Sequence, residues 1–119
     1  MYPRTETVNI TSDGTGVGTG YTGVIHGEIL AVSYIKDGTN PYDNGVDFTI
    51  TTETTLQAVL AVLNVAASKA WRPRAVVQAA ADGSDLTGVE SAYCAGERIK
   101  IVIAQATASK VGQFVITYA

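Results

Sequence analysis

The feature that most constrains the fold is a two-residue alternation of apolar side chains near the end of the chain. Isoleucine occupies three alternate positions of segment 98–105, and the same spacing recurs in segment 112–118 through Phe114, Ile116 and Tyr118. Because successive side chains of a strand point to opposite faces, this period predicts two half-buried β-strands and not helices. The two segments are close enough in sequence to pair as an antiparallel hairpin, and we expect them near the centre of a sheet.

The same alternation recurs earlier in the chain, between turns rich in Gly, Asp and Asn. It predicts strands at 6–12, 21–26, 28–36 and 46–52. Segment 55–65 fits both a helix and a strand, and its strand neighbours favour the strand. Segment 75–81 is either a brief strand or a helical turn, and 82–88 is expected to be a polar loop. Seven or eight short strands predict an all-β fold, an antiparallel β-sandwich or a small barrel.

The length of 119 residues suits one domain with one core, so we assign 1–119 to a single β domain. Residues 1–7 are polar and contain Pro3, and they lack the pattern needed to pack alone. We therefore expect them to form an extended N-terminal arm that becomes ordered against a partner.

The composition argues for covered surface and against several classes of partner. Only 16% of the residues are charged, below the usual quarter of a soluble domain, which predicts a homo-oligomer, a trimer or larger. The mild net charge of −3 argues against nucleic-acid binding. Apolar runs stay well short of the ~20 residues that span a bilayer, so no membrane association is expected.

The residues that carry chemistry are too few for an obvious active site. Cys94 and His26 are each the only residue of their type, so the chain cannot build a disulfide or a tetrahedral zinc site alone. Segment 18–23 matches G-x-G-x-x-G, but β-type residues follow it, which favours turn or close-packing glycines over dinucleotide binding. The oxygen-rich segment 37–47 does not match a calcium loop and is typical of turns. We therefore expect no enzyme activity, no metal and no cofactor.

The candidate interface lies around Pro73, where Trp71, Arg72 and Arg74 form the densest basic point of the chain. Arg and Trp are enriched at interface hot spots, but a solvated loop beside a core tryptophan explains the same residues. We add Tyr2, Pro3 and Arg4 of the N-terminal arm to this hypothesis, because the arm is expected to become ordered on a partner.

Four segments together resemble the small virion proteins of tailed bacteriophages, especially the head decoration (cement) proteins. They are 2–7, 45–51, 71–74 and 97–105. The resemblance implies a non-enzymatic structural protein that binds and stabilises the capsid surface. Its partners would be the major capsid protein or other virion subunits, and it would reside in the virion after synthesis in the bacterial host cytoplasm. The alternatives are a head–tail joining or tail component, and a carbohydrate- or host-surface-binding β-sandwich module.

Overall fold

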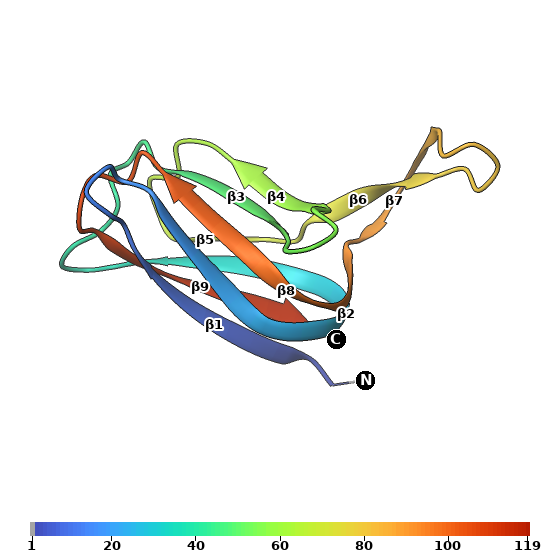
Figure 1. Cartoon of the computed structure of the whole chain (residues 1–119), viewed down its shortest axis with the longest axis horizontal. Helices are drawn as coiled ribbons and strands as arrows, with labels where there is room; N and C mark the ends of the chain where they lie inside the picture. The colour runs from blue at the N-terminus through green and yellow to red at the C-terminus, as the bar shows by residue number, and fades with distance from the viewer. Residues whose placement is uncertain (1) are drawn as a thin grey trace.

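The computed structural model describes residues 2–119, which form β-strands joined by turns and loops (Figure 1). The strands in chain order are β1 (Arg4–Thr11), β2 (Gly18–Lys36), β3 (Asp47–Thr52), β4 (Ala58–Val62), β5 (Lys69–Trp71), β6 (Arg74–Gln78), β7 (Asp85–Ser91), β8 (Tyr93–Ala104) and β9 (Val111–Tyr118). The predicted all-β, single-domain antiparallel β-sandwich is confirmed. Within residues 2–119 no helix is long and apolar enough to cross a membrane.

The sandwich has two layers that share β2. The first part of β2, Gly18–Glu28, pairs with β8, and the second part, Ile29–Lys36, pairs with β9. One layer therefore runs β1-β9-β2-β5 and the other runs β2-β8-β3-β4 (Figure 1). Gly27 lies between the two parts with φ +133°, and a side chain there would collide with the carbonyl of Ala119. The bend of β2 thus depends on a residue without a Cβ.

The prediction that segments 98–105 and 112–118 pair as a hairpin is wrong. β8 pairs with β2 and β3, whereas β9 pairs with β1 and β2, so the two strands belong to different layers. The link between them passes from one layer to the other at the edge of the core. There the backbone N–H of buried Ala106 donates a hydrogen bond to the Gly16 carbonyl over 3.0 Å. The crossing turns the apolar rows of both strands inward, where they pack against each other.

The core lies between these two apolar rows. The isoleucines of β8 and the alternating Phe114 and Ile116 of β9 are fully buried, as their spacing predicts. Phe48 of β3 contacts Phe114 and Tyr34 edge to face, with 4.8 Å between ring centroids in both pairs. Such contacts across the layers define one core and the orientation of both sheets.

Two glycines let the layers approach closely at β1. A Cβ on Gly20 would lie 2.7 Å from side-chain carbons of Val8 and Ile10, and one on Gly18 would lie 2.8 Å from Ile10. Both glycines are within β2, so the G-x-G-x-x-G segment is a packing feature of a strand, as expected. No helix N-terminus follows it in the described chain that would hold a phosphate.

Three differences from the predicted elements concern their extents. Segment 55–65 contains a strand, as favoured, but only over Ala58–Val62. Residues 2–119 form nine strands and not seven or eight. The short strand β5 has three residues, and β7 begins inside segment 82–88, which was expected to be a loop. The predicted arm 1–7 is too long: Arg4–Thr7 pair with β9, and Met1 lies outside the described residues.

Candidate protein-interaction site

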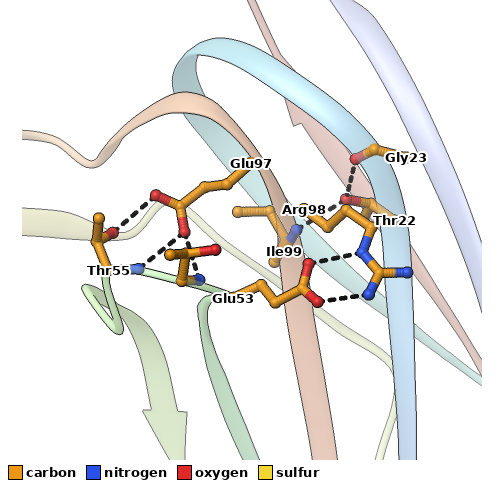
Figure 2. A network of polar contacts seen from close by, with 8 residues as sticks. Thr22, Gly23, Glu53, Thr55, Glu97, Arg98 and Ile99 are labelled. Atoms are coloured by element: carbon orange, nitrogen blue, oxygen red, sulfur yellow. Dashed lines mark hydrogen bonds and ion pairs between the residues drawn. The ribbon is translucent and has the colours of Figure 1, made fainter.

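A cluster of polar side chains joins the turn after β3 to the middle of β8 (Figure 2). The Arg98 guanidinium donates two hydrogen bonds to Glu53, from Nε to Oε2 over 2.6 Å and from Nη2 to Oε1 over 2.5 Å. The guanidinium also lies 4.2 Å from the centre of the Tyr21 ring. Two of its N–H groups and its planar face are therefore used within the chain.

Glu97 holds the same turn from the other side. Its Oε1 accepts hydrogen bonds from the backbone N–H groups of Thr54 and Thr55, and its Oε2 accepts one from the Thr55 hydroxyl over 2.8 Å. These hydrogen bonds lower the pKa of Glu97, and the hydrogen bond from Arg98 lowers the pKa of Glu53. A carboxylate with a lowered pKa is a weak base at neutral pH. The cluster fixes a turn and is not suited to acid–base chemistry.

Thr22 belongs to the same cluster and repairs an irregular stretch of pairing. The β2–β8 register shifts between Tyr21 and Val24. There the Thr22 hydroxyl accepts the Ile99 N–H over 3.0 Å and donates to the Gly23 carbonyl over 2.7 Å (Figure 2). The hydroxyl thus replaces a missing ladder partner for a buried amide.

Cys94 and His26, the two residues that occur once in the sequence and could carry chemistry, have contacts that give them structural roles. Cys94 is buried, its Sγ donates to the Glu97 carbonyl over 3.1 Å, and burial raises the pKa of its thiol. The His26 ring lies over Gly96, which has φ +77°. Residues 2–119 hold no group of three or more His, Cys, Asp or Glu side chains placed to bind a metal ion.

The feature that the rest of the fold does not explain is the β6–β7 hairpin, which projects from one end of the sandwich (Figure 1). The two strands pair only with each other, with Arg74 opposite Ser91 and Val76 opposite Val89. Its loop is well formed, because the Ala79 N–H bonds the Ser84 carbonyl over 2.8 Å. The hairpin is therefore an ordered element, and within residues 2–119 the outer edges of its two strands are unpaired.

Apolar side chains on the hairpin face solvent. Val76 is 43% exposed, Leu86 50% and Val89 57%. A two-stranded hairpin with no covering layer is marginally stable in water. Exposed edges with apolar side chains are also a template for pairing with another chain, which natural proteins normally protect. These properties make the hairpin the best candidate for an interaction site.

A second uncovered apolar surface is a groove of about 420 Å³ beside the loop that joins β4 to β5. It is lined by Val62, Leu63, Asn64, Val65, Ala66, Ala67, Ser68, Lys69 and Trp71. Leu63 is 74% exposed, whereas Trp71 is half-buried and packs its ring against Phe48. The Lys69 ammonium lies 5.8 Å from the centre of the Trp71 ring.

The structure separates the six residues predicted to form an interface. Tyr2 and Arg4 line a small cleft with His26 and Tyr118, whereas Trp71 lines the β4–β5 groove. Pro3, Arg72 and Arg74 are exposed, and Arg74 donates to the neighbouring Pro73 carbonyl over 3.0 Å. They do not form one patch, and their interface role stays a prediction. The sequence reasoning missed the hairpin that follows Arg74.

The comparisons with known proteins give a likeness of fold. No family model matches the chain, and no curated protein matches it. Seven chains of solved structures match. One is described as the crystal structure of FLHE, with a TM-score of 0.50 and 9% identity, over 99% of this chain and 98% of that one. At this identity the match shows a similar fold over nearly the whole of both chains.

The prediction of a phage capsid decoration protein is wrong. A solved structure that matches along nearly the whole chain is that of FLHE, and this match does not point to a phage capsid protein. The segments that suggested the phage proteins, such as 45–51 and 97–105, are core strands and turns of the sandwich. Strand patterns of this kind report the fold and do not identify the partner.

Proposed function

We propose that this protein is a non-enzymatic interaction module that binds a partner protein through its β6–β7 hairpin. The observation that carries the proposal is the solvent-exposed pair Val76 and Val89, which lies on a two-stranded element with no covering layer. A partner would cover this apolar surface and would pair with a free strand edge. Both contributions favour binding, the first by apolar burial and the second by main-chain hydrogen bonds.

The body of the sandwich acts as a rigid base for the hairpin. The base of the hairpin is fixed because Trp71, three residues before Arg74, packs on the core, and because only buried Ala92 separates β7 from β8. The polar cluster at Glu53, Glu97 and Arg98 stabilises the turn after β3 and takes no part in binding. This division is consistent with a scaffold that presents one exposed element.

The proposal is tested by photo-crosslinking in cells that naturally make the protein. A photoreactive phenylalanine analogue replaces Val89, and a matched control places it at Thr7, on the exposed face of β1. We expect a discrete adduct from position 89 that mass spectrometry identifies as a protein, and none from position 7. The identified partner should then protect the amides of Val76 and Val89 from hydrogen exchange. Adducts of equal yield from both positions, or none from 89, would refute the role of the hairpin.

A further inference from the structure

We infer that the partner of the hairpin is a second copy of this chain, and that the hairpin of one copy docks into the β4–β5 groove of the next. This inference rests on the proposed function, and it adds the identity of the partner. The hairpin and the groove are two uncovered surfaces whose apolar character and charge match.

The apolar character of the two surfaces is matched. The hairpin offers Leu86 and the short side chains of the loop segment 79–81, which are all alanine. The groove offers exposed Leu63, two small alanines and one side of Trp71. Docking would remove exposed apolar surface from water on both copies.

The charges of the two surfaces are opposite. The hairpin, Arg74–Ser91, carries three carboxylates, at Asp82, Asp85 and Glu90, and one cation, Arg74, at its base. The groove holds Lys69 in its lining, and the Lys36 ammonium reaches its edge, where it donates to the Ala66 carbonyl over 2.8 Å. Among residues 2–119, Arg98 with Glu53 is the one ion pair within 4 Å, so neither lysine is paired with a carboxylate.

One carboxylate, that of Asp47, also lies near the groove. Both of its oxygens accept hydrogen bonds within the chain, from the Asn64 N–H over 3.1 Å and from the Gln105 side-chain amide over 3.0 Å. These bonds partly neutralise its effect on an approaching anion. The two lysines therefore offer charges of opposite sign to an acidic hairpin.

The positions of the two surfaces allow head-to-tail contact. β4 runs away from the base of the hairpin, and the loop that follows it lies toward the other end of the sandwich (Figure 1). The hairpin points outward from the body, so it is placed to meet another molecule and not its own groove. Contacts between two different surfaces of identical chains repeat, and they produce rings or open chains.

A symmetric contact between two hairpins is less favourable. It would bring two sets of three carboxylates together, with one cation in each hairpin, Arg74 at its base. Like charges that face each other across an interface oppose association. The groove supplies two lysines, whereas a second hairpin supplies the one arginine at its base.

The test uses two full-length variants, each blocked at one surface. Leu86→Lys disables the hairpin, and Ala67→Glu fills the groove with an acidic side chain; both positions are exposed, so the fold should be retained. In sedimentation velocity the unmodified protein should form oligomers that grow with concentration. Each variant alone should associate at least about tenfold more weakly. An equimolar mixture of the two should form a 1:1 dimer, because one copy keeps its hairpin and the other keeps its groove.

Control variants and the other possible results show whether the hairpin and the groove contact each other. Thr7→Lys and Thr7→Glu make the same kinds of charge change on the outer face of β1 and should leave the oligomers unchanged. Higher salt should weaken the association of the unmodified protein. If Ala67→Glu associates as well as the unmodified protein, the groove is not the acceptor. If the unmodified protein is monomeric at every concentration while Val89 still crosslinks to a different protein, this inference fails and the proposed function stands.

Discussion

Val76 and Val89 lie directly opposite each other on β6 and β7, and both side chains face solvent. Elsewhere in the molecule, opposed apolar residues such as Phe48 and Ile103 are buried beneath the second layer. Cross-strand pairs stabilise a sheet mainly when something covers them. The valine pair is therefore an apolar surface that the fold of one chain leaves uncovered.

The close approach of β1 to β2 predicts a strong effect of a single methyl group. Gly20→Ala should lower the free energy of unfolding by about 1–3 kcal/mol, because the added Cβ would overlap the side chains of Val8 and Ile10. Gly14→Ala is the matched control, since its Cβ would meet nothing within 4 Å, and its effect should stay within about 0.5 kcal/mol. Urea denaturation measures both variants. Equal stability of the two would contradict this account of the glycines.

Tyr42 should contribute to stability through its hydroxyl as well as through its ring. The buried Oη donates a hydrogen bond to the Ile10 carbonyl over 2.5 Å, and burial raises the pKa of Tyr42 well above its ordinary value. Tyr42→Phe leaves that carbonyl without its partner and should cost about 1–3 kcal/mol. Tyr93→Phe, at an exposed position, should cost much less. Thermal unfolding that does not distinguish the two variants would show that the buried hydrogen bond is unimportant.

Stability should decline at acid pH partly through Glu97. Its pKa is lowered in the folded protein from an ordinary value of 4.5, so its contribution is fully present above that value and is lost as the pH falls through the folded pKa. Glu97→Gln should therefore melt at a lower temperature than the unmodified protein at neutral pH. The two melting temperatures should converge at acid pH. A gap that stays constant with pH would mean that the carboxylate charge does not hold the turn.

Cys94 should be inert in the folded protein. It is buried, and burial raises the pKa of its thiol, whereas the thiolate is the reactive form. A disulfide reagent followed by absorbance should react at least about a hundredfold more slowly with the folded chain than with the chain in denaturant. Equal rates would show that the region around β8 opens readily.

The periodicity of the sequence identified the buried side of the strands but not their neighbours. Alternation places Ile101 and Ile116 in the core, and both are fully buried. It does not say which strands pair, because a period of two is satisfied by any partner in register. The crossing of segment 105–110 between layers depends on the buried backbone bond of Ala106, which leaves no mark in hydrophobic spacing.

The candidate site was harder to predict than the core. The segment 75–81 has consecutive apolar residues without alternation, so it fitted a strand and a helical turn equally well. In the structure β6 is a strand whose Ala75 and Val77 are only partly buried, so spacing alone did not distinguish its two sides. Residue type directed attention to Trp71 and Arg72 instead, because both types are common at interfaces. The residue type does not show whether a side chain already packs within its own fold. The side chain of Trp71 does so, because it packs against the core.

The most direct test of the central claim removes the hairpin and keeps the rest. Arg74 and Ser91 are opposite each other on the ladder, so an Asn-Gly turn can join them in place of residues 75–90. We predict that this variant keeps its β-sheet circular dichroism, melts within roughly 5 °C of the unmodified protein and no longer associates in sedimentation velocity. A variant that fails to fold would place the hairpin within the fold, and one that associates as before would show that partners bind elsewhere.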